Sequence, residues 1–269
     1  MGTLKTVGKE AFKGLDKLKI TTPLTNLETV GDDAFSGCLD LSGVNVSGKL
    51  KTIGAHAFKN AKNINISVPL PDLEVIGVEA FYGNLTLRKI DSANKLREIG
   101  DGAFYGCKSL NSVTGDYNIN RIGEKAFYDC SNLTVFDNLE KVTSIGARAF
   151  MNCTSITSLA FPDAVSIGQE AFKGCTGLTS LCFARGNTPV SASIGARAFE
   201  NCTNINEVVC DSFNVPTLGE NCFPNNCGFT LLVPYNKSGE YTNIFAAYTS
   251  SVGYTTVRIT LVCGGTEST

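Results

Sequence analysis

The sequence predicts a repeat solenoid, mostly β with short helical or 3₁₀ turns. Two observations predict it: a six-residue pattern recurs ten times at nearly constant spacing, and a short alternating stretch usually follows each copy. The pattern, which we call the anchor, is an aliphatic residue, Gly, two variable positions, a small residue and Phe. The anchor glycines are Gly8, Gly31, Gly54, Gly77, Gly100, Gly123, Gly146, Gly168, Gly195 and Gly219, spaced by 23 six times and then by 22, 27 and 24.

Each anchor keeps its small residue and its aromatic residue. The small residue is alanine in nine copies and Cys222 in the tenth. The phenylalanines are Phe12, Phe35, Phe58, Phe81, Phe104, Phe127, Phe150, Phe172, Phe199 and Phe223. We expect them to stack into one shared hydrophobic column, because a single coil is too small to bury its own apolar face. The recurrent glycine supplies either a special backbone conformation or a close backbone approach that a Cβ would obstruct.

The residues after each anchor predict a turn and then a strand. A Cys, or Leu15, Ala61, Asn84 or Asn226, stands three residues after the Phe, and in nine copies an aliphatic residue stands three further on. This spacing suits one helical or 3₁₀ turn. The alternation that follows, as in Leu159-Ala160-Phe161, suits a short strand with every second side chain inward.

The whole pattern resembles the BspA-like class of leucine-rich repeats, best over Ile145-Gly146 to Phe161-Pro162. The resemblance implies a right-handed superhelix with a C-terminal cap. Residues 228–269 break the period and resemble that cap. We therefore divide the chain into residues 1–227, about ten repeats of about 23 residues, and a capping segment, residues 228–269. Leu4 and Val7 already occupy repeat positions, so we expect the chain to be a fragment of a longer protein.

The resemblance also implies an extracellular or cell-surface protein that adheres to host proteins or to other cells. With 23 basic and 25 acidic residues, the chain lacks the overall field that would hold it to nucleic acid or anionic membrane. No apolar run is long enough to span a bilayer, and the first residues lack the apolar region of a signal peptide.

The eleven cysteines and the single histidine do not predict chemistry. Six cysteines occupy a position where Leu and Ala substitute, which favours buried packing over disulfides or metal. Cys222 and Cys227 are the one pair left open as a disulfide. His56 lies at a variable anchor position without an orienting group beside it in the sequence, and no phosphate-binding loop occurs. We expect no enzyme active site, no cofactor and no metal.

The outward side chains of the strands form the predicted binding surface, a single sheet face running the length of the solenoid. Its candidate residues are Asn45, Lys89, Asp91, Ser112, Thr114, Asp137, Ser158, Ser180 and Glu207. Further outward positions are Val135, Ala160, Cys182 and Val209. An insertion around Arg185 and Asn187 adds a second candidate region.

This mixed polar face, without a basic stripe or an aromatic platform, argues against nucleic acid. It favours a protein partner, such as a host extracellular-matrix or cell-surface protein, or a glycan. The sequence therefore predicts a non-enzymatic binding or adhesion module. The alternative is a structural spacer or intracellular scaffold without a dedicated ligand. In that case the sheet face would only contact solvent, and the insertion would be a loop without a function of its own.

Overall fold

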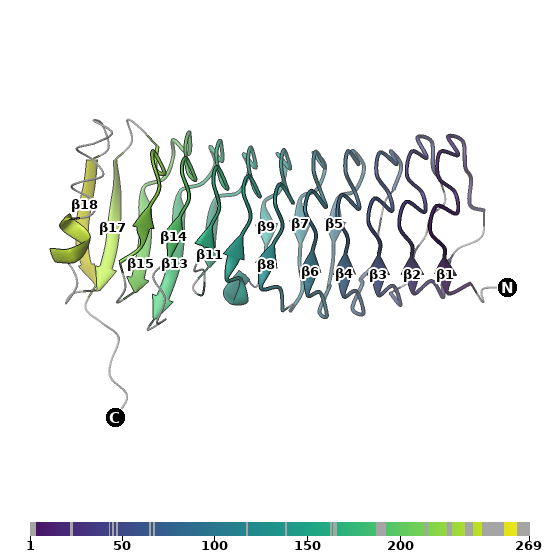
Figure 1. The fold of residues 1–269 in the computed structure, drawn as a ribbon, viewed down its shortest axis with the longest axis horizontal. Coiled ribbons are helices and arrows are strands. Elements are labelled where there is room, and N and C mark those ends of the chain that lie inside the picture. Colours follow the sequence, from purple (N-terminus) through teal and green to yellow (C-terminus); the bar gives the residue numbers. More distant parts are fainter. Residues whose placement is uncertain are drawn as a thin grey trace, which may run out of the picture.

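The computed structural model describes residues 4–21, 24–42, 44, 46, 48–64, 66, 68–116, 118–137, 139–161, 163, 166–186, 192–212, 215–224, 228–234, 239–243 and 256–262. These residues form an elongated solenoid in which coils follow one another from the N-terminal to the C-terminal end (Figure 1). Neighbouring strands pair in parallel, as expected when each coil returns to the same side. The predicted fold class is confirmed.

One long side of the solenoid carries a ten-stranded sheet, which we call the anchor sheet. Each of its strands has two residues and ends on the aliphatic residue of an anchor. The strands are β1 (Thr6–Val7), β2 (Thr29–Val30), β3 (Thr52–Ile53), β4 (Val75–Ile76), β6 (Glu98–Ile99), β8 (Arg121–Ile122), β10 (Ser144–Ile145), β12 (Ser166–Ile167), β14 (Ser193–Ile194) and β16 (Thr217–Leu218). In every strand the second residue points into the core and the first lies outward and more exposed.

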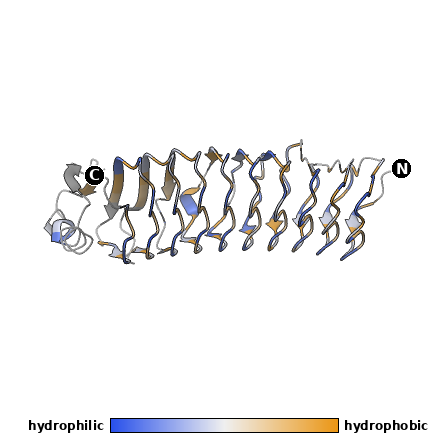
Figure 2. Ribbon diagram, turned by 90° about the horizontal axis from the view of Figure 1, so that it is seen from above, coloured by the Kyte–Doolittle hydropathy of each residue, from blue (hydrophilic) through white to orange (hydrophobic). Residues whose placement is uncertain are grey.

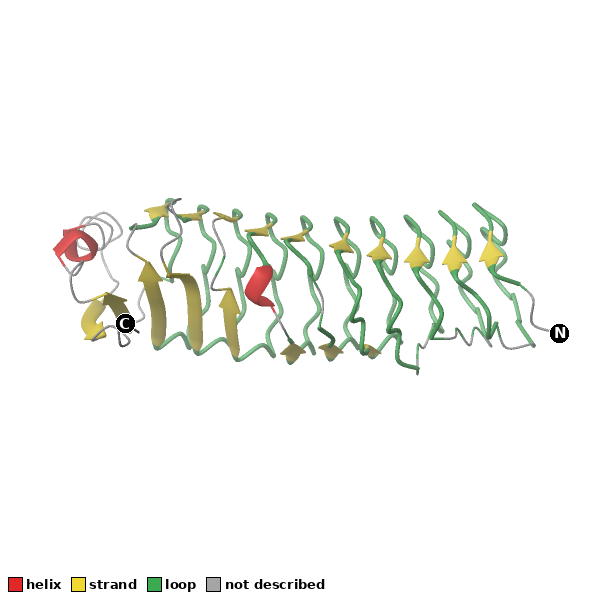
Figure 3. Ribbon diagram, turned by 90° about the horizontal axis from the view of Figure 1, so that it is seen from below, coloured by secondary structure: helices red, strands yellow, loops and turns green. Residues whose placement is uncertain are grey.

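The opposite long side, which we call the strand face, is interrupted. A three-stranded sheet contains β5 (Lys89–Ile90), β7 (Ser112–Val113) and β9 (Val135–Phe136). A five-stranded sheet contains β11 (Ser158–Phe161), β13 (Ser180–Gly186), β15 (Glu207–Ser212), β17 (Gly228–Pro234) and β18 (Thr256–Val262). The 3₁₀ helix η1 (Leu139–Lys141) lies between the two sheets (Figure 3). The prediction of one sheet face along the whole solenoid is therefore wrong for the described residues.

The segment after each anchor glycine is a run of turns with alternating hydrogen bonds. The N–H groups of Ala34 and Cys38 donate within the coil, to the residue three positions earlier, at 3.2 Å each. The N–H groups of Asp33, Phe35 and Gly37 donate to carbonyl oxygens of the next coil, at 2.8 Å each. The spacing of three seen in the sequence thus corresponds to bonds between residues three apart. The alternate residues Asp33, Phe35 and Gly37 hydrogen-bond each coil to the next one.

Close approach of the backbone explains the anchor glycine. A Cβ built on Gly146 would lie 2.6 Å from the backbone nitrogen of Glu124 in the preceding coil. The other anchor glycines from Gly31 onward meet the preceding coil in the same way, whereas nothing lies within 4 Å of a Cβ on Gly8, in the first coil. None of them has a positive φ angle. Of the two explanations left open by the sequence, the structure supports steric exclusion.

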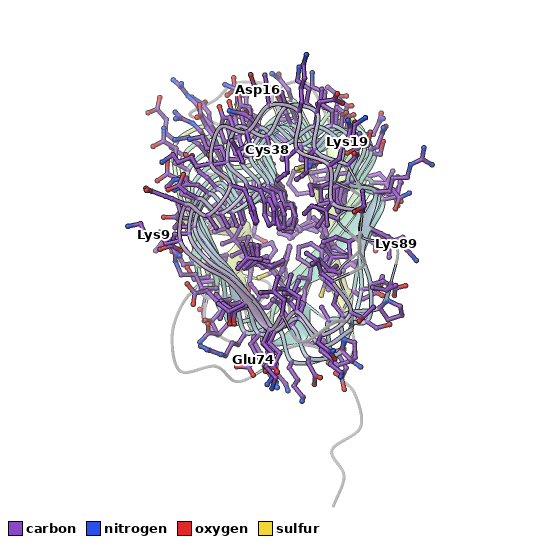
Figure 4. All side chains as sticks on the ribbon, turned by 90° about the vertical axis from the view of Figure 1, so that its right-hand side faces the viewer. Lys9, Asp16, Lys19, Cys38, Glu74 and Lys89 are labelled. Carbon is purple, nitrogen blue, oxygen red and sulfur yellow. The ribbon has the colours of Figure 1, made fainter. Side chains whose placement is uncertain are left out.

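The predicted phenylalanine column forms the centre of the core. From Phe12 to Phe223 successive rings stack with centroids 5.1–5.5 Å apart and planes within 17° of parallel. Phe12 is partly buried and the other nine are buried. Viewed along the solenoid axis, the side chains of successive coils overlie one another between the two sides marked by Lys9 and Lys89 (Figure 4). Along every coil, hydrophobic and hydrophilic residues alternate (Figure 2).

The C-terminal part continues the five-stranded sheet. β17 pairs with β15, and β18 pairs with β17. Residues 239–243 are helical, and their Tyr241 is buried with its hydroxyl 3.2 Å from the Cys210 sulfur. The division at residue 228 and the role of the following segment as a cap stay predictions.

Candidate binding surface

The predicted surface residues fall into two groups on the strand face, one on each sheet. Lys89, Ser112 and Val135 are in register on the three-stranded sheet. Ser158, Ser180 and Glu207 are in register on the five-stranded sheet. Asn45 and Asn187 lie outside the described residues, and Arg185 lies in β13 with only its backbone described. The structure therefore divides the described strand-face candidates between two places. Three lie on the five-stranded sheet, and five lie on the three-stranded sheet or directly after its strands: Lys89, Asp91, Ser112, Thr114 and Asp137.

The group on the three-stranded sheet is held by its own polar contacts. Asp91 pairs with the Lys89 ammonium at 3.0 Å and accepts hydrogen bonds from Ser92 and Thr114 at 3.1 Å each. The hydrogen bond from Lys89 is the main cause of a lowered pKa of the Asp91 carboxyl. The Ser112 hydroxyl donates to Asn111 at 3.0 Å.

Asp137 is exposed at the end of this group, and its backbone N–H donates to the Val113 carbonyl at 3.3 Å. On the three-stranded part of the strand face, these polar side chains therefore already bond to one another or to adjacent residues.

The group on the five-stranded sheet lines a groove of about 350 Å³. Ser158, Ser180 and Glu207 form one row across β11, β13 and β15. A second row, two residues further along these strands, is Ala160, Cys182 and Val209. Phe136, Leu139 and Glu140 line the groove from the side of η1. The groove thus has one polar and one largely apolar row of outward side chains, and a wall that the sequence did not predict.

The interruption by η1 creates that wall. Phe136 ends β9 and packs between the columnar rings of Phe127 and Phe150, with centroids 5.0 and 5.8 Å away. Leu139 is buried, whereas Glu140 is exposed on the same turn. The chain therefore stays anchored to the core where the three-stranded sheet ends, and it stands beside β11 as a rim. Glu140 and Glu207 place two carboxylates on the groove.

A second surface follows the turns after the anchor glycines, and we call it the turn edge. His56 has Asp33 and Glu79 on either side, with nitrogen–oxygen distances of 3.8 and 3.6 Å. The sequence analysis found no orienting group for His56 because these two carboxylates belong to neighbouring coils, 23 residues away in each direction.

Three tyrosines also stack on the turn edge. The ring centroids of Tyr82 and Tyr105 are 4.7 Å apart, those of Tyr105 and Tyr128 are 4.5 Å apart, and the planes are nearly parallel. The ammonium of Lys59 lies 5.0 Å from the centroid of Tyr82. Burial is the main cause of a raised pKa of the Tyr105 hydroxyl. The recurrence of Tyr directly after the anchor Phe in three successive copies was the sequence signal for this stack.

Comparison with known proteins shows what the chain is similar to. The model of the BspA type leucine rich repeat region matches in six copies, over residues 2–91, 64–179 and 187–251. The chain belongs to this family. Its members are typically non-enzymatic repeat proteins. No curated protein matches.

Two solved structures of leucine-rich repeat proteins, with TM-scores of 0.50 and 0.53, share the fold, and a third is similar in sequence. A leucine-rich repeat protein from Bacteroides ovatus is 19% identical with a TM-score of 0.50, over 98% of this chain and 82% of that one. The pneumococcal vaccine antigen PcpA is 15% identical with a TM-score of 0.53, over 97% and 72%. A leucine rich cell surface protein from Faecalibacterium prausnitzii is 21% identical with a TM-score of 0.46, and this chain spans 63% of it.

In this BspA-type chain, the recurrent cysteines are hydrogen-bonded elements of the core. The sulfur of Cys130 donates to the carbonyl oxygen of Phe104 in the preceding coil at 3.1 Å, and Cys38, Cys107, Cys153, Cys175 and Cys202 make the equivalent bond. Burial raises the pKa of the Cys130 thiol well above its ordinary value. The nine cysteines of the described part form no disulfide with one another, and the proposed partner Cys227 lies outside it.

Asn84 replaces the recurrent cysteine in one BspA-type coil. Its side-chain amide donates to the Ala61 carbonyl at 2.6 Å, and its oxygen accepts from the N–H groups of Thr86 and Leu87.

Within the described residues, no group of His, Cys, Asp and Glu side chains is arranged to hold a metal ion. Over the same residues, no helix has the length and apolar character needed to cross a membrane.

Proposed function

We propose that this chain is a non-enzymatic binding module of a surface or secreted protein. It recognises a protein partner through the groove on the five-stranded part of the strand face. The observation that supports this most is the combination, in one hollow, of an apolar row and a polar row with two carboxylates, Glu207 in the polar row and Glu140 on the η1 side. Ligand sites typically combine apolar lining with a few polar groups that fix orientation.

The charge of the rim indicates the kind of partner. Glu140 and Glu207 are both exposed, and among the described side chains that line the groove there is no Lys or Arg. A partner segment that inserts an apolar side chain over Ala160 and carries a basic residue beside it would complement both features. We expect its association rate to fall with rising salt concentration, because exposed charges act mainly on diffusional encounter.

The surface location is a proposal that rests on the family resemblance, since a fold by itself does not determine where a protein is located. Host extracellular-matrix and cell-surface proteins are therefore the first partners to test. Adhesion would be the cellular outcome of such binding. Surface labelling of intact cells that express the natural protein would test the location.

The binding test uses two matched lysine substitutions. Ser158 and Ser193 are both exposed serines at the first position of a parallel strand, one in the groove and the other on the anchor sheet. Immobilised matrix and cell-surface proteins would be screened by surface plasmon resonance with the wild-type chain, Ser158→Lys and Ser193→Lys. We expect Ser158→Lys to weaken binding at least about tenfold and Ser193→Lys to leave it within about twofold.

Charge reversals at Lys89 and Asp91 would define the extent of the footprint. They lie on the three-stranded sheet, beyond η1 from the groove, so we expect effects below about threefold. Equal affinity of wild type and Ser158→Lys would remove the groove from the proposal. Absence of any partner in the screen would favour the spacer alternative.

A further inference from the structure

The turn edge contains a second hollow, separate from the strand face. It measures about 450 Å³ and is lined by Val78, Glu79, Tyr82, Asp101, Gly102, Tyr105, Glu124 and Lys125. These residues come from three successive coils and include two of the stacked tyrosines. The hollow has the size of a small-ligand site, and the proposed protein-binding groove does not use it.

A departure from the repeat produces this hollow. The residue two positions after the anchor glycine has a positive φ angle in all ten coils. It carries a polar or charged side chain in nine of them: Glu10, Asp33, His56, Glu79, Lys125, Arg148, Glu170, Arg197 and Asn221. Gly102, with a φ of 61°, is the exception. Gly102 is buried, and a Cβ on it would lie 3.1 Å from the Glu79 Cγ, so the missing side chain lets Glu79 pack against the backbone there; the hollow opens beside this contact and Tyr105.

The rest of the turn edge shows what that side chain does elsewhere. In other coils the side chain two positions after the anchor glycine forms ion pairs. Its partner is the residue three positions further along the same coil or another charged residue nearby. Lys13 pairs with Glu10 and Asp33, and Lys173 pairs with Glu170 and Glu200. In the coil of Gly102, neither of these two positions is charged, because the first is Gly102 and the one three residues further on is Tyr105. The ionic surface is therefore replaced there by an open space with an aromatic wall.

The charges around the hollow balance. The three carboxylates each have a cationic partner: Lys59 pairs with Glu79, Arg121 with Asp101 at 3.0 Å, and Lys125 with Glu124 at 2.7 Å. No net local charge therefore attracts an ionic ligand. The paired groups still offer hydrogen-bond acceptors on the carboxylates and donors on the cations, and the phenol of Tyr105 can do both.

The chemistry that fits is a neutral polyhydroxylated molecule with apolar C–H surface. Its hydroxyl groups can use donors and acceptors in close alternation, and its C–H groups can pack on the edges of the tyrosine rings and on Val78, which is 43% exposed. Stacking covers the faces of Tyr105 on both sides, so a ligand meets the ring edges and hydroxyl groups. We propose that the hollow at Gly102 binds a neutral oligosaccharide.

A matched pair of asparagine substitutions tests this proposal. Gly102→Asn adds a side chain at the hollow: its Cβ would lie 3.1 Å from the Glu79 Cγ, so the Glu79 side chain must shift, whereas the backbone suits Asn because Asn221 occupies the equivalent position with a φ of 51°. Gly106→Asn makes the same change four residues away, outside the hollow. Asn60, Asn152 and Asn201 occupy the position equivalent to Gly106, also with positive φ. Both variants should therefore fold, and thermal unfolding would verify it.

The probes are neutral tetrasaccharides of glucose, galactose and mannose, with a heparin tetrasaccharide and tetra-arginine as charged comparators. Binding would be followed by saturation-transfer NMR and by tyrosine fluorescence, which is accessible because the chain has no tryptophan. We expect a neutral tetrasaccharide to bind wild type and Gly106→Asn equally and Gly102→Asn at least about tenfold more weakly. Tyr105→Phe, which keeps the ring and removes the hydroxyl, should weaken binding roughly threefold to tenfold.

Three results would overturn the proposal. The first is no neutral saccharide binding up to about 10 mM, which is weaker than any useful site. The second is binding that Gly102→Asn leaves unchanged. The third is tighter binding of tetra-arginine or heparin that Gly102→Asn abolishes, because the hollow would then serve a charged ligand. Substitution at Ser158 does not affect this hollow, so the two proposals can fail separately.

Discussion

The two long sides of the solenoid are made by the same repeats but differ in regularity. On the anchor sheet all ten strands have two residues, and their registers run without a break from β1 to β16. On the strand face the strands grow from two residues in β9 to seven in β13, and η1 separates two sheets. Both sides enclose the same phenylalanine column.

The difference shows where the repeat is constrained. On the anchor side, the glycine must touch the preceding backbone and the Phe must stack, so a change in one coil disturbs its neighbours. On the strand face every second side chain also points outward, but there both the outward residues and the strand length vary from coil to coil. Both hollows described above occur where the local pattern departs from the repeat, at η1 and at Gly102.

The largest expected effect comes from the column itself. Phe127→Ala should lower the free energy of unfolding by about 3–5 kcal/mol, because it removes a buried ring between two stacked neighbours. Val135→Ala, on the strand face of the same coil, should cost less than about 1 kcal/mol, because Val135 is 41% exposed. Urea denaturation followed by circular dichroism would measure both. Similar losses for the two variants would break the comparison.

An intermediate effect is expected at the anchor glycines. Gly146→Ala should destabilise the chain by about 1–3 kcal/mol, because its Cβ would lie 2.6 Å from the Glu124 nitrogen. Gly8→Ala, the matched control, should be neutral or stabilise by up to about 1 kcal/mol, since open space surrounds that position. The same denaturation experiment applies. A destabilisation by Gly8→Ala equal to that by Gly146→Ala would contradict steric exclusion as the reason for the glycine.

The smallest expected effect concerns the charges beside the anchor sheet. Glu28 pairs with Lys51 at 2.8 Å and Lys5 at 2.9 Å, and the hydrogen bond from Lys51 is the main cause that lowers its pKa to about 2. A lowered pKa in the folded state gives stability that is present above about pH 4.5 and is lost as the pH falls towards 2. Because Lys5 and Lys51 are exposed and Glu28 is only partly buried, the contribution is small and salt-dependent.

Melting temperatures at pH 5 and pH 2 would test this. Wild type should melt slightly higher than Glu28→Gln at pH 5, and the gap should close by pH 2. A gap that persists at pH 2 would show that the carboxylate charge of Glu28 is not its cause. An NMR titration of the Glu28 side chain would check the pKa directly.

The sequence was sufficient for the core because the core repeats. The phenylalanine column and the burial of the recurrent cysteine position could both be predicted from the period. It was not sufficient for the surfaces. His56 obtains its carboxylate neighbours from the coils before and after it, and the groove obtains its wall from η1, where the alternation ends.

The sequence by itself determined the solenoid, the family and the residues that face inward, because these follow from a pattern that occurs ten times at nearly constant spacing. Only the tertiary structure decided that the glycines serve close packing, that the strand face is divided, and that hollows lie beside η1 and Gly102. The physical reason is that each of these features depends on contacts between coils about 23 residues apart. Such contacts follow from how the coils stack, and no single repeat contains them.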